Sequence, residues 1–174
     1  MSKESTPRAN WIKPVIAALV VAALAIGGYA AMNQKPAAPE VTFVSLTGQK
    51  ISSQSLRGKV VMVNFWATSC VSCVREMPAM VDTYNKFKGQ GLEFVAVAMK
   101  YDPPNYVINF TETRKLPFIV ALDSGGDIAK AFNDVSLTPT TFVIDKDGKI
   151  IKKYVGEPDF TALHVLLAKA LAAG

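Results

Sequence analysis

The order of apolar and polar positions separates an N-terminal apolar run from a longer region of alternating elements. Residues 15–32 contain no charged side chain, and basic side chains precede them. A helix over this run is about 27 Å long at 1.5 Å per residue, which is enough to cross the hydrocarbon core of a bilayer. We therefore expect one N-terminal transmembrane helix, with residues 1–14 in the cytoplasm and everything after the helix translocated.

A cleaved secretory signal peptide is the competing interpretation of this run, and it would release the protein as a secreted one. Small residues around Gly28 resemble a cleavage site, but the run exceeds the roughly 7–15 apolar residues of such peptides. Residues 33–40, NQKPAAPE, have the composition of a short tether. We expect the globular domain over residues 41–174.

Strand and helix patterns alternate through this domain before it ends in a hairpin and a helix. Apolar runs and period-two alternation predict strands, and apolar stripes of period 3.6 predict helices. The predicted strands are 41–46 and 50–52 (a small edge hairpin), 59–66, 92–99, 118–121, 140–145 and 150–155, and the predicted helices are 71–87, 105–114, 127–132 and 160–172. Residues 59–66 are apolar on both faces, which indicates a central strand. The sequence therefore predicts an α/β fold with a mixed central sheet and helices on both faces.

Local signals fix some of the element ends. Asp102 precedes two prolines, so we expect its side chain to cap the helix that follows. Asp159 is expected to cap the last helix in the same way. The pair Asp147-Gly148 between two β-rich runs predicts a hairpin turn.

Composition excludes several classes of protein. The chain has 174 residues, of which 50% are apolar and 19% charged, so it is not a disordered chain. The net charge of +5 is not arranged as a basic stripe among aromatic side chains, so we expect no nucleic-acid partner. Two cysteines are too few for a disulfide-stapled scaffold, and a single histidine, His164, leaves no ligand set for structural zinc. We expect neither a metal nor another cofactor.

The two cysteines lie at the junction of a predicted strand and a predicted helix. Unpaired backbone N–H groups and the helix dipole favour negative charge at the first turn, so Cys70 is expected to be an accessible, thiolate-prone residue. Cys73 lies one turn further along the same face, where it can close a disulfide with Cys70 and be the buried member of the pair. Such a pair supports thiol–disulfide exchange through a mixed disulfide. The alternative is two inert buried cysteines or half of a metal site.

Four motifs carry a resemblance to a known family. They are VNFWATSCVSC at 63–73, REMP at 75–78, TPTTF at 138–142 and IDKDG at 144–148. In this order and spacing they resemble the TlpA-like family, which comprises membrane-anchored, thioredoxin-fold thiol–disulfide oxidoreductases of bacteria. The resemblance implies a thioredoxin-like fold, an anchor in the inner membrane and a domain that faces the periplasm.

The resemblance also implies what the protein acts on. Members of the family reduce protein disulfides, often the haem-attachment cysteines of apocytochromes c or the metal-site cysteines of oxidases. A dithiol stays reduced in an oxidising compartment only if electrons are supplied continuously. Protein disulfide clients and a transmembrane electron donor are therefore the expected partners.

The resemblance assigns roles position by position. Cys70 matches the attacking cysteine and Cys73 the resolving one. Pro139 matches the cis-proline that faces the disulfide, and Thr138 before it would offer backbone groups to a client peptide. Spacing alone also allows Pro139 to be an ordinary turn proline. Trp66 keeps its family position and is expected either to line the site or to be a plain core aromatic.

Glu76 is the candidate for proton transfer. It follows Cys73 by one helical turn and matches the acidic residue that influences proton transfer in the family. With a raised pKa, its carboxylate would accept the proton of Cys73, whereas the alternative is a solvated helix glutamate. Asn64 occupies the strand position where cytosolic thioredoxins carry a buried aspartate, and an amide cannot titrate. Ser69 stands where the family usually has tryptophan, so the rim of the site loses apolar surface.

Two other classes of function share parts of this pattern. A thiol peroxidase on a related fold needs a Pro-x-x-x-Thr-x-x-Cys loop, but Thr68 is only two residues before Cys70 and residue 63 is valine. A copper-delivery module would normally separate its cysteines by three residues and add a histidine, and His164 is poorly placed for that. The sequence therefore favours an oxidoreductase of protein disulfides.

Overall fold

The chain forms two units, which are described separately. The computed structural model describes residues 12–32 and 35–173. The first unit is Met1–Lys35 and the second is Pro36–Gly174.

The described part of the first unit is helix α1, Ile12–Met32. The apolar run expected to be helical, residues 15–32, lies within α1. Across the described ranges, no helix meets the combined requirement of length and apolarity for a membrane-crossing segment. The segment expected in the cytoplasm falls largely on residues 1–11, which lie outside the described residues.

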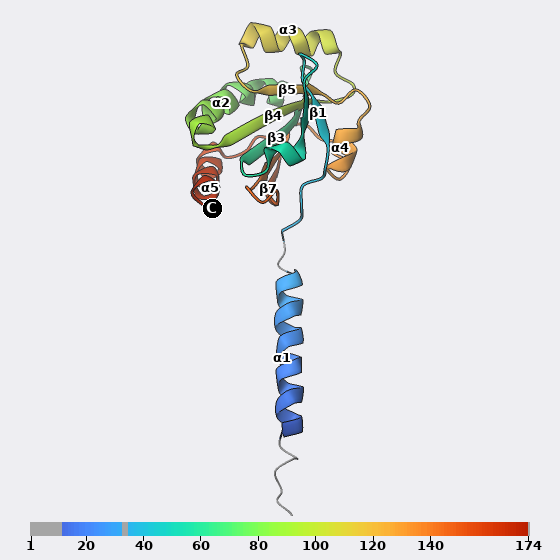
Figure 1. Cartoon of the computed structure of the whole chain (residues 1–174). Helices are drawn as coiled ribbons and strands as arrows, with labels where there is room; N and C mark the ends of the chain where they lie inside the picture. Colours follow the sequence, from blue (N-terminus) through green and yellow to red (C-terminus); the bar gives the residue numbers. More distant parts are fainter. Residues whose placement is uncertain (1–11, 33–34, 174) are drawn as a thin grey trace, which may run out of the picture. The chain divides into compact units, whose positions relative to one another are not determined.

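A five-stranded mixed sheet is the centre of the second unit (Figure 1). Its strand order is β5-β4-β3-β6-β7. The bounds are β3 Val60–Trp66, β4 Leu92–Ala98, β5 Ile119–Leu122, β6 Thr140–Ile144 and β7 Ile150–Val155. Strands β3, β4 and β5 are parallel to one another, whereas β6 is antiparallel to β3 and β7 is antiparallel to β6.

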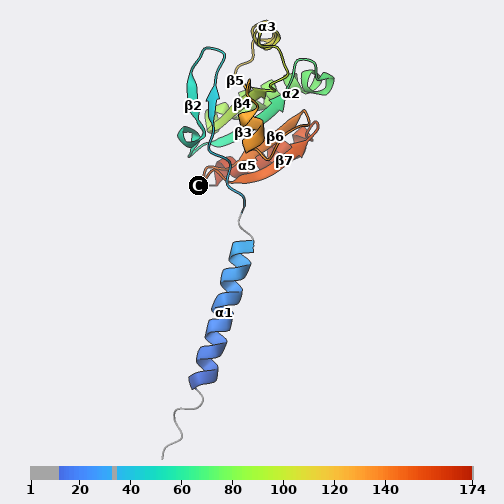
Figure 2. The same ribbon diagram turned by 90° about the vertical axis from the view of Figure 1, so that its right-hand side faces the viewer.

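Helices lie on both faces of this sheet (Figure 2), and an apolar cluster fills the space on each face. The covering helices are α2 Val71–Phe87, α3 Pro104–Arg114, α4 Asp127–Ala131 and α5 Phe160–Ala172. Side chains alternate between the faces of a strand, so Met62 of β3 joins the cluster with α2, α3 and α5, and Val63 joins the cluster with α4. All seven residues of β3 are buried. The predicted α/β fold with helices on both faces is thereby confirmed.

Residues before β3 lie along both edges of the sheet. A small hairpin, β1 Thr42–Val44 and β2 Lys50–Ser52, precedes the short 3-10 helix η1, Ser53–Leu56. Ser45 forms an isolated bridge with Ala121 of β5. At the opposite edge Ala37, which we expected to belong to the tether, pairs with Lys149 beside β7.

Of the two capping residues predicted from the sequence, Asp159 caps its helix and Asp102 does not. Asp159 caps α5, where its Oδ1 accepts from the backbone N–H of Thr161 at 2.8 Å. The expectation that Asp102 caps α3 is wrong, because Pro103 is the N-cap residue and has no side-chain cap bond. The carboxylate of Asp102 is already bound to Thr68, a contact described below.

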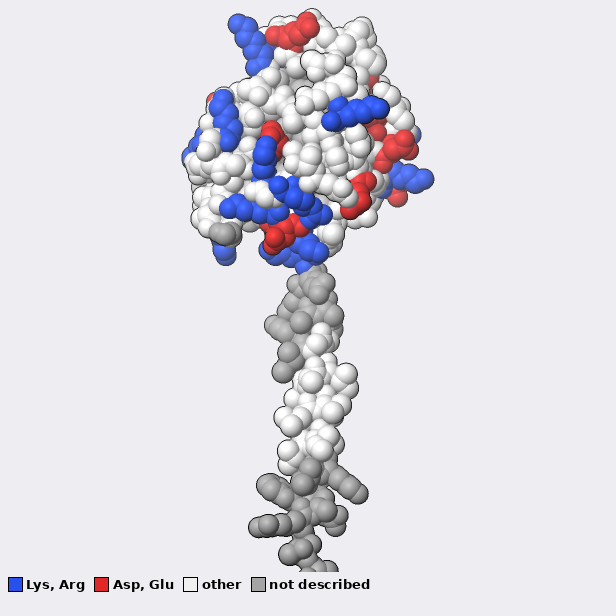
Figure 3. Space-filling view, viewed as in Figure 1, with Lys and Arg blue, Asp and Glu red and all other residues white. Residues whose placement is uncertain are grey.

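Basic and acidic side chains are interspersed on the face of the second unit that Figure 3 shows. Lys59 and Glu93 of this unit form an ion pair at 3.1 Å.

Candidate active site

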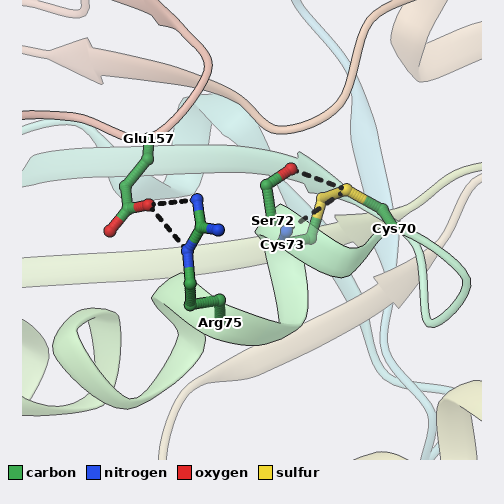
Figure 4. A network of polar contacts seen from close by, with 5 residues as sticks. All are labelled: Cys70, Ser72, Cys73, Arg75 and Glu157. Atoms are coloured by element: carbon green, nitrogen blue, oxygen red, sulfur yellow. Dashed lines mark hydrogen bonds and ion pairs between the residues drawn. A yellow bond between two sulfur atoms is a disulfide. The ribbon is translucent and has the colours of Figure 1, made fainter.

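Cys70 and Cys73 form a disulfide at the N-terminus of α2, directly after the central strand (Figure 4). Their Cα atoms are 5.2 Å apart. Cys70 is the N-cap residue of α2, and its Sγ accepts from the backbone N–H of Cys73 at 3.2 Å. The sulfur thus occupies the place of a capping oxygen, where the helix dipole favours negative charge.

The two sulfurs differ in their access to solvent. Cys70 is half-buried, whereas Cys73 is fully buried in the cluster that packs α2 on the sheet. A thiolate from another molecule can therefore approach Cys70 but not Cys73. This agrees with the expectation that Cys70 is the accessible member of the pair.

A buried aspartate holds the segment that leads into Cys70. Asp102 is 4% exposed and lies in the loop after β4. Its Oδ2 accepts from the backbone N–H of Thr68 at 2.6 Å, and its Oδ1 accepts from the Thr68 hydroxyl at 2.5 Å. Two charge-assisted hydrogen bonds fix this turn two residues before the reactive sulfur. Ser69, between Thr68 and Cys70, is exposed.

Glu76 is a buried residue of α2 and is not the solvated helix residue of the alternative interpretation. It is 1% exposed, and its position three residues after Cys73 puts the two Cβ atoms about 5–6 Å apart on one helix face. Glu76 Oε1 accepts from the side-chain amide of Asn64 at 3.1 Å, and the same amide donates to the Thr141 hydroxyl at 2.9 Å. Asn64 therefore links α2 to β6 through the central strand.

Burial makes ionisation of Glu76 unfavourable. Removal from water raises its pKa to about 7, and nearby Glu157 acts in the same direction. The hydrogen bond from Asn64 and the charge of Arg75 oppose this rise, but they are smaller effects. Within the described residues, Glu76 Oε2 has no hydrogen-bond partner, which also penalises the charged form. A carboxyl group with this pKa can exchange a proton near neutral pH.

An exposed ion pair lies beside this buried group. Arg75 of α2 donates to Oε2 of Glu157 through Nε at 3.2 Å and through Nη2 at 2.9 Å (Figure 4). Glu157 belongs to the connection between β7 and α5. The pair joins this connection to the helix that carries the cysteines.

Thr138 and Pro139 lie at the same end of the sheet as the cysteines. Strand pairing places Phe65 opposite Thr140, so Pro139 precedes β6 where β3 ends. The Thr138–Pro139 peptide bond is cis, as expected. The carbonyl of Pro139 accepts from the backbone N–H of Gly156 at 2.8 Å.

Thr138 is more accessible than Pro139. It is half-buried, whereas Pro139 is buried. Its hydroxyl lies 3.3 Å from the hydroxyl of Tyr101, whose side chain is exposed. Among the backbone groups of the described residues, none forms a hydrogen bond with the backbone of Thr138. Its N–H and C=O thus have no backbone partner in the part of the chain that the structure describes.

Trp66 lies in the core and not on the rim of the site. Its side chain is 0% exposed and its ring packs on Phe110 of α3, with centroids 5.1 Å apart. Its indole N–H has no hydrogen-bond partner within the described part of the chain. This placement is the one that the core-aromatic interpretation expects.

Side chains that could hold a metal ion do not gather in groups of three or more anywhere in the described ranges. His164 lies on α5 and its Nε2 is 2.9 Å from the hydroxyl of Thr83 on α2. It thus belongs to the packing of two helices.

Sequence reasoning missed Thr141 and the actual role of Asp102. Parallel pairing of β3 and β4 brings the segments after their carboxyl ends to one edge of the sheet, but the order of residues does not indicate that Asp102 binds Thr68 rather than the start of α3. Nothing in the sequence indicated that Thr141 would bind Asn64, because threonine is common in strands for its β-propensity alone.

Comparison with known proteins identifies relatives over most of the second unit. A family model described as Redoxin matches residues 33–166. Thiol-disulfide oxidoreductase ResA of Bacillus thuringiensis subsp. konkukian (strain 97-27) is 40% identical over 133 residues, which are 76% of this chain and 75% of that protein. ResA of Bacillus subtilis (strain 168) is 35% identical over 137 residues, 79% of this chain and 75% of that protein.

A solved structure is similar over the same region. The crystal structure of a thiol:disulfide interchange protein of the thioredoxin family from Chlorobium tepidum TLS superimposes with a TM-score of 0.73 at 30% identity. The similarity covers 80% of this chain and 98% of that one.

Proposed function

Because the chain belongs to the Redoxin family, and within it to the ResA-like thiol–disulfide oxidoreductases, we propose that it reduces disulfide bonds of protein clients through Cys70 and Cys73. The observation that carries this proposal is the disulfide at the N-terminus of α2, with one accessible and one buried sulfur. Exchange chemistry needs this asymmetry, because the mixed disulfide forms on the accessible sulfur and is resolved by the buried one.

The reaction proceeds in two exchanges. The Cys70 thiolate attacks a client disulfide, so that a bond forms between Cys70 Sγ and one client sulfur while the client S–S bond breaks and releases a thiolate. Cys73 then gives its proton to Glu76 and attacks Cys70 Sγ, which releases the second client sulfur. The client leaves with two further electrons as two thiolates, which take up protons from water, Glu76 returns its proton to water, and the Cys70–Cys73 disulfide forms. A membrane dithiol donor would return the pair to its reduced state.

The burial and pKa of Glu76 support its part in the second exchange. A carboxylate with a pKa of about 7 is ionised in part at neutral pH and can accept the thiol proton of Cys73. Asn64, which cannot titrate, holds the carboxyl group in place. Glu76, which lies one helical turn after Cys73, is therefore the proposed acceptor of the Cys73 proton.

Strand addition beside the disulfide is the proposed mode of client binding. The backbone groups of Thr138, which pair with no other backbone group of the described residues, can pair with an extended peptide. Leu137, which precedes it, is a large apolar residue with 65% exposure, and Tyr101 is 54% exposed. These side chains suit a client segment with apolar residues beside its cysteines. The family resemblance points to the haem-attachment cysteines of apocytochromes c or the metal-site cysteines of oxidases.

A trapping experiment tests the proposal. Cys73→Ser lets Cys70 attack but leaves no thiol for resolution, so it should accumulate a mixed disulfide with a peptide that carries an oxidised Cys-x-x-Cys-His segment. Cys70→Ser is the matched control and should form none. In the wild-type protein, the same peptide should be reduced when an excess of a dithiol donor is present.

Oxidation of the reduced peptide by the disulfide form would contradict the proposed direction. A reduction potential near about −120 mV, typical of strong protein oxidants, would point the same way.

We also propose that α1 anchors the chain in a bacterial inner membrane as a single pass, with the second unit in the periplasm. The uncharged run at 15–32, with basic residues before it, supports this proposal. The protein should fractionate with membranes, and protease added on the periplasmic side should digest residues after 35. A soluble form whose N-terminus lies near Ala31 would instead support cleavage and secretion.

A further inference from the structure

We propose that the hydroxyl of Ser72 is a catalytic hydrogen-bond donor to the Cys70 sulfur, and that it stabilises the Cys70 thiolate in the reduced enzyme. This inference deepens the proposed function and rests on Cys70 being the attacking thiol.

The geometry of the disulfide form identifies the donor. Ser72 lies between the two cysteines in the first turn of α2, is half-buried, and has its Oγ 3.4 Å from Cys70 Sγ (Figure 4). A disulfide sulfur carries no hydrogen, so the hydroxyl of Ser72 is the donor. The backbone N–H of Cys73 donates to the same sulfur at 3.2 Å. Two donors from one helical turn therefore converge on the atom that attacks the client.

Reduction strengthens this hydrogen bond. When the disulfide opens, the weakly accepting sulfur of Cys70 becomes a thiolate, and a hydrogen bond to a charged acceptor is roughly twice as strong as one to a neutral acceptor. Ser72 therefore stabilises the thiolate more than it stabilises the disulfide or the neutral thiol. Cys70 then ionises at a lower pH, and the disulfide becomes easier to reduce because its reduced form is stabilised.

The size of the effect follows from the energies of hydrogen bonds. Loss of the extra stabilisation of the charged form is worth about a tenfold change in the ionisation constant, so the pH midpoint of Cys70 ionisation should rise by about one unit in Ser72→Ala. The exchange equilibrium with a reference dithiol should shift by up to about tenfold toward the disulfide, which corresponds to about 30 mV for this two-electron couple.

Client reduction rates are a poor readout of this role. Below the midpoint, a tenfold loss of thiolate is offset by a roughly threefold gain in the nucleophilicity of a more basic thiolate, which leaves a net change of only about threefold. The ionisation midpoint has no such compensation. It also needs neither a client nor an electron donor, so it can be measured even if the proposed reductase activity fails.

The experiment measures alkylation of Cys70 across a pH series in the full chain. A Cys73→Ser background leaves one reactive thiol, because the chain has two cysteines. Ser72→Ala should raise the midpoint by about one unit, and Ser72→Thr, which keeps a hydroxyl, should stay close to the Ser72 protein. Val71→Ala is the matched control, since it changes the other intervening residue, whose exposed side chain is apolar, and should leave the midpoint unchanged.

Three results would overturn the inference. One is a rise below about half a unit in Ser72→Ala. Another is an equal rise in Ser72→Thr, which would attribute the change to something other than the hydroxyl. The last is an equal rise in Val71→Ala, which would assign the change to the helix turn as a whole. Circular dichroism of each variant checks that the overall secondary structure is unchanged before the comparison is made.

Discussion

The substitution Glu76→Gln keeps the shape of a buried side chain and removes its titration. In the native protein the pKa of Glu76 is raised from 4.5 to about 7, with burial as the main cause. The folded state therefore holds this proton more tightly than the unfolded state does, so stability falls as the pH rises from about 4.5 through 7. A shift of this size corresponds to about 3 kcal/mol of stability that is present at low pH and lost above neutrality.

The assay is urea unfolding of the oxidised full chain at several pH values between 4.5 and 8.5. At the acid end, glutamine resembles the protonated glutamate, so the free energies of unfolding of the two proteins should be similar. At the alkaline end, Glu76→Gln should be the more stable by about 3 kcal/mol. Other titrating groups are common to both proteins, so the difference between the two curves isolates Glu76. Glu112→Gln, at an exposed position of α3, makes the same chemical change and should give a flat difference.

The substitution that stabilises the fold at alkaline pH should slow catalysis. Glu76→Gln lacks the proton acceptor for Cys73, so resolution of the mixed disulfide should slow and lose its pH dependence near 7. A difference in unfolding free energy that stays within about 0.5 kcal/mol across the series would refute the raised pKa. Unchanged resolution rates between pH 6 and 9 would refute the proton transfer even if the stability result holds.

Other substitutions around the site have expected outcomes of different sizes. Asn64→Asp puts a second carboxyl group against Glu76, so the pKa of Glu76 should rise further. Between pH 5 and 8 the free energy of unfolding should then fall by more than the wild-type loss of about 3 kcal/mol. A fall equal to that of the wild-type protein would contradict this expectation. Asp102→Asn leaves one acceptor oxygen for Thr68 and replaces the other with an amide nitrogen that only donates, so it should cost about 1–3 kcal/mol in urea unfolding. No loss would show that the contact is dispensable. Arg75→Ala breaks an exposed ion pair and should cost less than about 1 kcal/mol, while the pKa of Glu76, followed through the pH dependence of unfolding, should rise because Arg75 lowers it.

The part of the site that sequence reasoning could reach is the part built from neighbouring residues. The apolar run of β3, the helical stripe of α2 and the two cysteines between them are local, so their periodicities indicate a strand, a helix and a reactive first turn. Asp159 is local as well, because a cap bonds to N–H groups two or three residues away.

Contacts between distant segments were beyond this kind of reasoning. The signal before α3 favoured Asp102 as a cap, but Thr68, 34 residues earlier, offers a backbone N–H and a hydroxyl that bind its carboxylate instead. Spacing placed Glu76 on the cysteine side of its helix, but its near-complete burial depends on how α2 lies on the sheet. Helical periodicity gives the face of a residue and not the depth at which that face is covered.

The bridges of Ser45 and Ala37 bear on how the protein behaves in concentrated solution. The outer edge of a sheet presents unpaired N–H and C=O groups, which act as a template for another chain and so promote self-association. Here Leu46 N–H donates to Val120 at the β5 edge, and Ile150 N–H donates to Pro36 at the β7 edge. Beyond that point β7 carries the exposed Lys152 and Lys153, and charge at an edge discourages pairing. A truncation that begins at β3 would uncover both edges at once, so it should aggregate more readily than a chain that begins at Pro36 and keeps these edge contacts.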